Sequence, residues 1–442
     1  MPIAMLRKIL AHIISDEEQK LFVKLTSQTF ILRLLGMALL YANQVLMARL
    51  MGAGAYGDYT VIMTWINFFV AISIFGFDHG AQRFFSMLFG SKRMEYARGF
   101  IRFSFRTIYL MSFVSMIGWF LFLWFTQSSN KPSTYSEAFF FSMFIIPLLA
   151  IIYQASAIFR ALHRIKISLV SVYVLLPIGI SVVSAVWYKS RGGLHADGAV
   201  LANLSCTFLV AWFMMRRIRK TLPPEYESIE PKYETKIWLS AGLTYLGMNV
   251  LTLLIKQVDI LFVSHYLDHE KAGIYSAAVK ISALIPFGLT IVDFVYTPRI
   301  STLYAKNDRQ HLQQYISHAA RLVLYITIPL SVVLIGGGKL LLELFGKEFQ
   351  ASYLPLIILI AGQLINALTG MVGPLMTMTG NQNIFLLVYF VASVIDVALN
   401  YLLVPRFGAT GAAISSAVSV ATLNIIMYFI VRKKLQVKAS VF

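Results

Sequence analysis

Apolar runs of about 20 residues recur along this chain of 442 residues, and they limit its possible folds more than any other feature. A helix of that length crosses the ~30 Å hydrocarbon layer of a bilayer. The sequence is 58% hydrophobic and 13% charged, whereas about 25% of the residues of a soluble domain are charged. The pattern predicts an all-α integral membrane protein with several spans.

Twelve spans are expected, divided by a polar linker at 216–236 that carries Pro223-Pro224 and mixed charge. They lie at about 27–48, 59–80, 103–125, 138–158, 167–188, 197–215, 238–264, 273–297, 319–337, 352–376, 383–404 and 410–431. The segment 338–350 is too short to span and is expected at the membrane surface. The linker composition favours a loose tether. Residues 1–26 predict an amphipathic helix on the cytoplasmic interface, because apolar residues repeat at helical spacing beside Arg7 and Lys8.

The two halves share landmarks that indicate an internal duplication. At one offset of 216 residues, five positions of the first half are repeated: Gly57 as Gly273, Tyr59 as Tyr275, Arg83 as Arg299, Arg93 as Arg309 and Tyr109 as Tyr325. In each copy an apolar helix ends, a short turn carries Gly-x-Tyr, and a second apolar helix follows. Since six spans is an even number, we expect two six-helix lobes, 27–215 and 237–431, related by a pseudo-twofold axis along the membrane normal.

The distribution of basic residues predicts the orientation of the chain. One set of loops and ends carries 27 Lys and Arg and the other carries 8, and the remaining three lie inside spans. By the positive-inside rule, both termini, including the tail 432–442, are expected in the cytoplasm. The formal charge of +18 therefore reflects topology, and no nucleic-acid partner is expected.

Several motifs resemble bacterial O-antigen and capsule flippases. In the first half they are Ala48-Arg49-Leu50-Met51-Gly52, Tyr56-Gly57-Asp58-Tyr59 and Phe75-Gly76-Phe77-Asp78 with Arg83; in the second they are Gly273–Ala278, Pro286, Pro298-Arg299 and Leu344–Glu348. The chain resembles, over essentially its whole length, the Wzx-type polysaccharide transporters of the multidrug/oligosaccharidyl-lipid/polysaccharide superfamily. The resemblance implies flipping of undecaprenyl-pyrophosphate-linked oligosaccharide across the bacterial inner membrane. It also implies membrane lipids and polysaccharide polymerase machinery as partners.

Enzymatic and cofactor-dependent functions lack support in the sequence. There is no GxxxxGK[ST] phosphate-binding loop, and the single cysteine, Cys206, lies in an apolar run and provides no thiolate metal site. His265 and His269 lie beside Asp268 and Glu270 in a short outer loop, which favours an ordinary solvated loop over a metal site. We expect no catalytic residues, no metal and no cofactor.

Charges inside spans are costly and usually face a cavity or a partner. In span 238–264 a polar face is formed by Tyr245, Asn249, Thr252, Lys256 and Asp259, which are spaced 4, 3, 4 and 3 residues apart. At the offset of 216 the first span carries Thr29, Arg33, Gly36, Leu40 and Asn43. We expect these faces to line a cavity between the lobes; polar helix packing is the alternative. The substrate-path candidates are Arg33, Asn249, Lys256, Asp259 and Lys280.

The remaining charged positions are candidates for coupling or structural roles: Asp78, Arg83, Asp293, Arg299 and Asp396. Asp78 is expected to pair with Arg83 or to cap its span. Asp396 is either an internal polar contact or a protonatable coupling site. Lys256 and Asp259, one turn apart, have a self-neutralising ion pair as their simplest interpretation. Pro286 and Gly288 predict a kink in the eighth span.

Three functions follow from these patterns. The first is an alternating-access flippase for an anionic lipid-linked oligosaccharide, for which the cations at Arg33, Lys256 and Lys280 would provide a path. The second is a cation-coupled multidrug exporter, which the same cations disfavour. The third is a non-transporting scaffold in polysaccharide assembly, which has no need of charges inside its spans.

Overall fold

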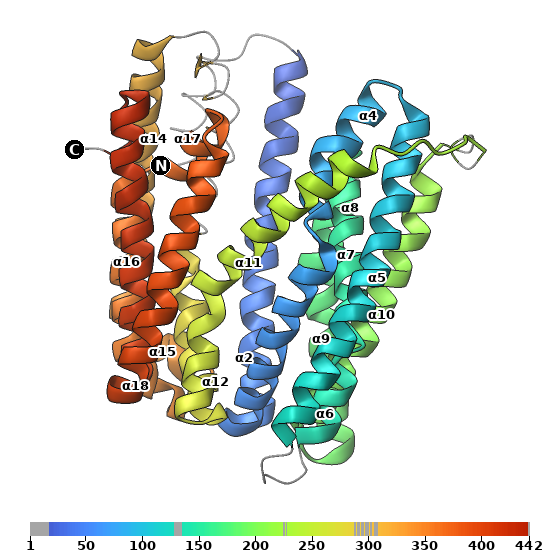
Figure 1. Cartoon of the computed structure of the whole chain (residues 1–442). Coiled ribbons are helices and arrows are strands. Elements are labelled where there is room, and N and C mark those ends of the chain that lie inside the picture. The colour runs from blue at the N-terminus through green and yellow to red at the C-terminus, as the bar shows by residue number, and fades with distance from the viewer. Residues whose placement is uncertain are drawn as a thin grey trace.

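The computed structural model describes residues 17–127, 135–223, 226, 228–286, 289, 292, 296, 300, 303–304 and 308–440, and every regular element in these ranges is helical. Nine of the described helices are long and apolar enough to cross a membrane. Two of these, in α2 (Glu17–Ile74) and α18 (Gln382–Leu435), contain a non-helical glycine, Gly52 and Gly408. The positive φ of both glycines lets the chain reverse within one residue, so each is a pair of antiparallel spans (Figure 1).

The other elements of the first half are α3 (Phe77–Gly80), η1 (Ala81–Phe85), α4 (Ser86–Gly90), α5 (Met94–Gln127), α6 (Tyr135–Ser142), α7 (Ile145–Ala161), α8 (Ile165–Val170), η2 (Ser171–Leu175), α9 (Leu176–Arg191) and α10 (Ala196–Thr221). Those of the second half are α11 (Thr235–Tyr266), α12 (His269–Ser282), α14 (Arg309–Gly336), α15 (Gly338–Glu343), η4 (Lys347–Ser352), α16 (Tyr353–Thr369) and α17 (Val372–Met378). This all-α membrane architecture confirms the predicted fold class.

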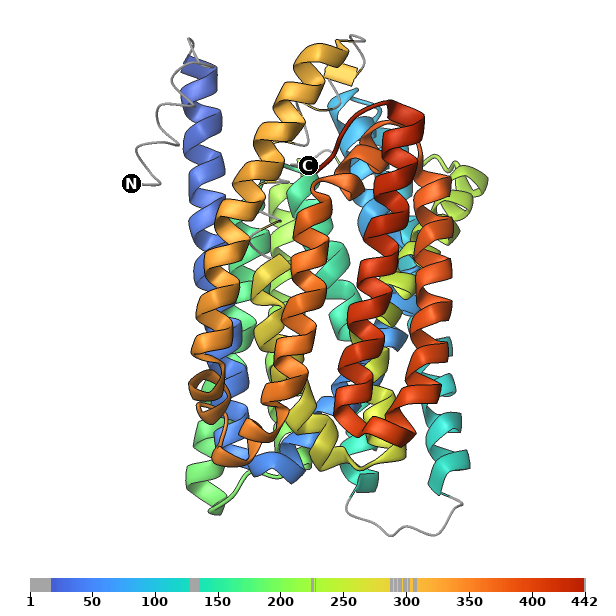
Figure 2. The ribbon, with the colours of Figure 1, turned by 90° about the vertical axis from the view of Figure 1, so that its left-hand side faces the viewer.

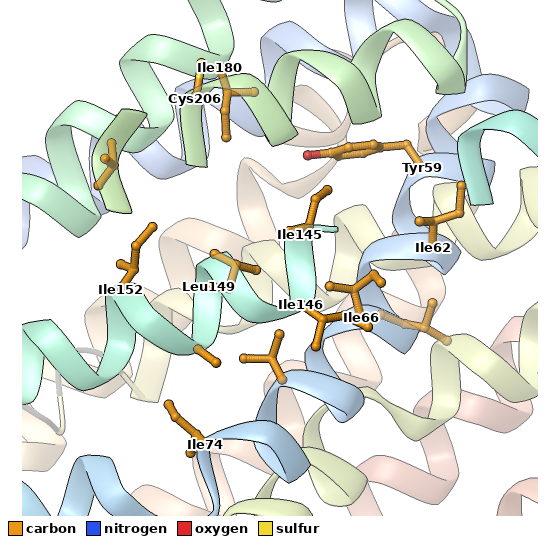
Figure 3. Packing of buried hydrophobic residues seen from close by; sticks show 14 of the residues in the cluster. Tyr59, Ile62, Ile66, Ile74, Ile145, Ile146, Leu149, Ile152, Ile180 and Cys206 are labelled. Atoms are coloured by element: carbon orange, nitrogen blue, oxygen red, sulfur yellow. The ribbon is translucent and has the colours of Figure 1, made fainter. Parts of the chain in front are cut away.

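Two helical groups stand side by side in Figure 1, with α2 and α11 between them, and Figure 2 views the molecule from the side of α14, α16 and α18. We call the end at which α10 leads into α11 the linker end, and the opposite end, which contains Gly57 and Gly273, the glycine end. The linker end is at the top of Figure 1. In the first group, buried aliphatic side chains of α7 pack against α2, and Figure 3 shows Ile146 and Leu149 close to Ile66. Burial of this kind fixes α2 to the first group.

Helix α11 connects the two groups. Its first turns belong to the first group, where Trp238 is 1% exposed and packs against the rings of Phe100 (5.4 Å) and Phe103 (5.7 Å). Its remaining length packs against α12 and α18 of the second group. A rigid helix shared in this way makes the two groups depend on each other mechanically.

The linker differs from the expected loose tether, because it is docked along α5. The Lys232 ammonium lies 2.6 Å from Glu95, and this hydrogen bond raises the pKa of Lys232. Arg93 pairs with Glu234 at 3.4 Å, and Arg98 donates to the Ile229 carbonyl. The mixed charge that suggested a solvated tether instead matches charges on α5.

The segment 338–350 buries Leu342, Phe345 and Phe349, which are at most 1% exposed, and its expected position at the membrane surface stays a prediction. One further expectation needs correction. Gly57 and Gly273 do not form turns; both lie inside helices, α2 and α12. Residues 1–16 lie outside the described residues, so the predicted interfacial helix stays a prediction.

Candidate functional site

The two halves meet at the glycine end through the two glycines that the repeat matches. A Cβ on Gly57 would lie 1.9 Å from the His269 carbonyl oxygen, and one on Gly273 would lie 2.6 Å from the Gly57 Cα. Backbones therefore touch where any side chain would hold them apart. Arg49 adds a second bridge by donating to the carbonyls of Leu344 (2.6 Å) and Glu343 (2.7 Å).

Lys280 belongs to this closed contact. Its ammonium donates to Gln44 Oε1 at 2.7 Å and to the Tyr56 hydroxyl at 2.6 Å, both on α2. The Tyr56 ring also packs against Phe345 and Phe349. The structure thus places this predicted path residue between the halves, with a fixed set of partners.

Lys256 and Asp259, which the sequence suggested as an ion pair, are separate. Lys256 is exposed, and no ion pair joins it to Asp259 among the described residues. Asp259 is 2% exposed and accepts hydrogen bonds from the Tyr275 hydroxyl (2.6 Å), the Ser416 hydroxyl (2.9 Å) and the Ile260 N–H (2.9 Å). Hydrogen bonds from these hydroxyl groups offset the cost of burying the Asp259 carboxylate, whereas the sequence predicted that Lys256 would offset it.

A second carboxylate lies close to Asp259 inside the second half. Asp396 is fully buried; Asn400 donates to its Oδ1 at 3.4 Å, whereas its Oδ2 has no hydrogen-bond partner among the described residues. Asp396 lies on α18, the helix whose Ser416 donates to Asp259. Two carboxylates buried together repel each other when both are ionised, so this pair suits a bound proton or small cation.

The first half has uncharged counterparts of Asp259 and its partner Tyr275. Asn43, at the position equivalent to Asp259, accepts from Ser181 at 2.8 Å. Tyr59, equivalent to Tyr275, accepts from Asn203 at 2.8 Å. The two halves therefore bury matching polar groups, and only the second half makes them acidic.

Five residues from both halves form a polar contact nearer the linker end. Asn249 donates to the Asp78 carboxylate at 3.4 Å and lies 3.2 Å from His79 Nε2. His79 stacks on Tyr245 with ring centroids 5.3 Å apart, and Arg83 donates to the Tyr245 hydroxyl at 3.4 Å. We call these residues the inter-half cluster.

The predicted pairing of Asp78 with Arg83 is wrong, because Asp78 lies against His79 (3.8 Å) and Arg83 reaches across to α11.

Arg160 and Arg33 add positive charge to the first half. Arg160 lies in the last turn of α7 and donates to Ser156 (2.8 Å) and Ser168 (3.4 Å), and Arg33 lies on α2. Sequence reasoning missed Arg160 by counting it as a loop residue. Its place at the end of an apolar span, four residues after Ser156, was the available signal.

Other predicted positions are not brought into this site. Asp293, Gly288 and Arg299 lie outside the described residues, so their expected roles stay predictions. Helix α12 ends at Ser282, before Pro286. His269, expected in a solvated loop, instead contacts Asp58 of the first half at 2.9 Å.

The fold resembles solved transporters of one superfamily. An inward-facing multidrug resistance MATE family transporter of the MOP superfamily matches with a TM-score of 0.71 and 13% identity over 91% of this chain and 94% of its own. The lipid II flippase MurJ in an inward closed conformation matches with a TM-score of 0.70 and 16% identity over 93% and 87%. At such identities the likeness concerns the fold alone.

Sequence comparison adds two relatives and two families. A probable low-salt glycan biosynthesis flippase, Agl15, of Haloferax volcanii is 22% identical over 170 residues, 38% of this chain and 36% of its own. A putative O-antigen transporter of Shigella flexneri is 22% identical over 238 residues, 53% and 55%. The matches thus span about a third to just over half of these curated relatives.

The MatE family matches residues 245–402, and the polysaccharide biosynthesis protein family matches residues 22–304. Because that second match covers more than half of its length, the chain belongs to the polysaccharide biosynthesis protein family.

Proposed function

We propose that this protein is an alternating-access flippase that translocates undecaprenyl-pyrophosphate-linked oligosaccharide for surface polysaccharide synthesis. The observation that carries the proposal is the positive charge of the contact near the linker end, where Arg83 reaches across to Tyr245 and Arg160 ends α7, while the halves are in contact at the glycine end. The net positive charge suits a diphosphate, for which arginine is a bidentate partner.

The oligosaccharide and the lipid tail need different surroundings. The amide of Asn249, the Tyr245 hydroxyl and His79 offer hydrogen bonds that sugars use. The polyprenyl chain stays in lipid, where the helices expose large apolar side chains. The relatives' names, an O-antigen transporter and a glycan biosynthesis flippase, support this substrate class.

Energy coupling is assigned to the buried carboxylates of the second half. Asp259 and Asp396 lie on α11 and α18 of the second half, whereas the arginines lie on α2, η1 and α7 of the first, so a proton or cation and the anionic substrate would not share a site. The uncharged counterpart around Asn43 supports a role for the second half alone.

A cation-coupled drug exporter is the second candidate, favoured by the MatE match over the region that contains both carboxylates. A cationic drug would be repelled by Arg33, Arg83 and Arg160, and this is why the flippase is preferred. A non-transporting scaffold accounts for neither set of charges.

The test is deletion of the gene in its own host, followed by analysis of lipid-linked oligosaccharide. We expect polyprenyl-pyrophosphate-linked oligosaccharide to accumulate on the cytoplasmic leaflet and surface polysaccharide to disappear. Wild-type protein should restore both, and Arg33→Gln/Arg160→Gln should fail while reaching normal membrane abundance. Unchanged polysaccharide with greater sensitivity to cationic drugs would replace the flippase with the exporter.

A further inference from the structure

His269 lies in the closed contact between the halves, where its carbonyl faces Gly57. It begins α12, and its Nδ1 lies 2.9 Å from Asp58 Oδ1 of α2, 211 residues away in sequence. The two side chains are 30% and 17% exposed, so water reaches the pair without fully screening it. The pair sits directly on the contact in which the His269 carbonyl faces Gly57.

Separation of the halves at the glycine end must break this pair. Asp58 belongs to the first half and His269 to the second. The backbones of Gly57 and His269 are in contact there, so the two halves cannot move apart without separating the Asp58 and His269 side chains. An ion pair forms only when the imidazole is protonated, whereas a neutral imidazole keeps a single hydrogen bond. Histidine ordinarily titrates near pH 6.5, within the range that cells and their surroundings cover.

We propose that Asp58 and His269 form a latch through which protons at the glycine end favour the closed contact there. The inference rests on the alternating access proposed above, and it adds a gating role for two residues outside the substrate and coupling sites. A protonated imidazole makes an ion pair with Asp58 that a neutral imidazole does not, so acid favours the closed state and this added stabilisation is lost when the solution becomes alkaline. With the glycine end outside the cell, an acidic exterior would speed the return of the empty flippase.

Neighbouring charges could modify the latch, so they need to be named. Helix α12 itself carries Asp268, Glu270 and Lys271, the end of α11 carries His265, and η4 carries Lys347 and Glu348. Lys271 is paired with Asp268 at 3.3 Å. His265 is exposed beside Tyr266 and provides a matched control, since it is a histidine of the same region with no hydrogen bond to Asp58 in the described structure.

The experiment measures the distance between the halves without substrate. Spin labels are placed at Ser190→Cys and Ala351→Cys, exposed positions of the first and second halves at the glycine end, in full-length protein in lipid nanodiscs. The native Cys206 is 4% exposed, and protein without the new cysteines controls for labelling there. Pulsed electron paramagnetic resonance then measures the distance between the two labels, which gives the closed and open populations at several pH values.

We expect the ratio of closed to open protein to fall about threefold between about pH 5.5 and pH 8, the size typical of a partly exposed ion pair. His269→Gln and Asp58→Asn should remove this dependence, and His265→Gln should retain it. A pH-independent wild type, or a response that persists in His269→Gln, would overturn the latch. Because no substrate is present, failure of the polysaccharide assay alone would leave the latch standing.

Discussion

Lys280 and Lys256 show how two cations of neighbouring helices differ in role. Lys280 bonds to Gln44 and Tyr56 across the halves, whereas Lys256 is exposed. We expect Lys280→Gln to shift the protein toward separation at the glycine end, because a shorter amide cannot reach both partners. Lys256→Gln should leave that equilibrium unchanged. The Ser190/Ala351 label pair measures both variants, and equal effects of the two would contradict the assignment.

The buried carboxylates give a second prediction at the residue scale. Asp396→Asn removes a charge whose Oδ2 has no hydrogen-bond partner among the described residues, so membrane abundance should be normal or higher. Transport should be lost if this group carries the coupling ion. Quantitative immunoblotting and surface polysaccharide are measured together, with the exposed Glu137→Gln as control. Normal polysaccharide in Asp396→Asn would end the coupling role.

Asp259 marks the limit of sequence reasoning at this scale. Helical spacing put Asp259 on one face with Lys256, whereas Asp259 is buried and Lys256 is exposed, because spacing cannot reveal partners from distant helices. Its actual partners, Tyr275 and Ser416, come from α12 and α18. The repeat contained the missing signal, since Tyr59 and Asn203 pair at the equivalent place in the first half.

At the scale of elements, contact between α2 and α12 depends on two glycines. Gly57→Ala and Gly273→Ala each put a Cβ within 3 Å of backbone, which we expect to destabilise the closed contact by about 1–3 kcal/mol. Gly54→Ala, on the same helix with nothing within 4 Å, is the matched control. The label pair again gives the populations. A closed fraction in Gly57→Ala as high as in Gly54→Ala would be inconsistent with this packing.

The docked linker makes a further element-scale prediction. A Cβ on Gly99 would lie 1.8 Å from the Lys232 carbonyl oxygen, so Gly99→Ala should displace the linker from α5. The thermal unfolding midpoint of purified protein should fall, while Gly90→Ala, which meets nothing within 4 Å, should leave it unchanged. An unaltered midpoint in Gly99→Ala would restore the loose-tether interpretation.

Hydropathy predicted the elements better than their associations. Span positions follow from apolar length alone, and the long helices α5, α10, α11 and α14 cover the ranges expected for them. The docking of Trp238 into the first group was not foreseeable, because an apolar face does not specify which group it packs against. The same holds for Phe345 and Phe349, whose partner Tyr56 lies almost 300 residues earlier.

The whole molecule combines a closed end, a basic contact near the other end and a helix shared by both groups. If one group rocks against the other, the contact between Gly57 and Gly273 opens. The same motion strains the first turns of α11, because Trp238 fixes them to the first group. The residues of the inter-half cluster lie on α3, η1 and α11, so this motion would also change their spacing. In the proposed flippase, substrate release and gate opening would therefore be linked through α11.

Orientation in the membrane is the last prediction. The 27-to-8 division of basic residues predicts that the linker end lies in the cytoplasm, where the arginines of the proposed flippase would meet a substrate made inside the cell. Reporter fusions after residues 95, 225 and 310 should report cytoplasm, and those near 130, 192 and 268 should report the exterior. Ser190→Cys should react with an impermeant maleimide added to whole cells, while a cysteine at Ser228 should react only after lysis. A reversed pattern would place the His269 latch inside the cell and would require the protein to import, rather than export, its anionic substrate.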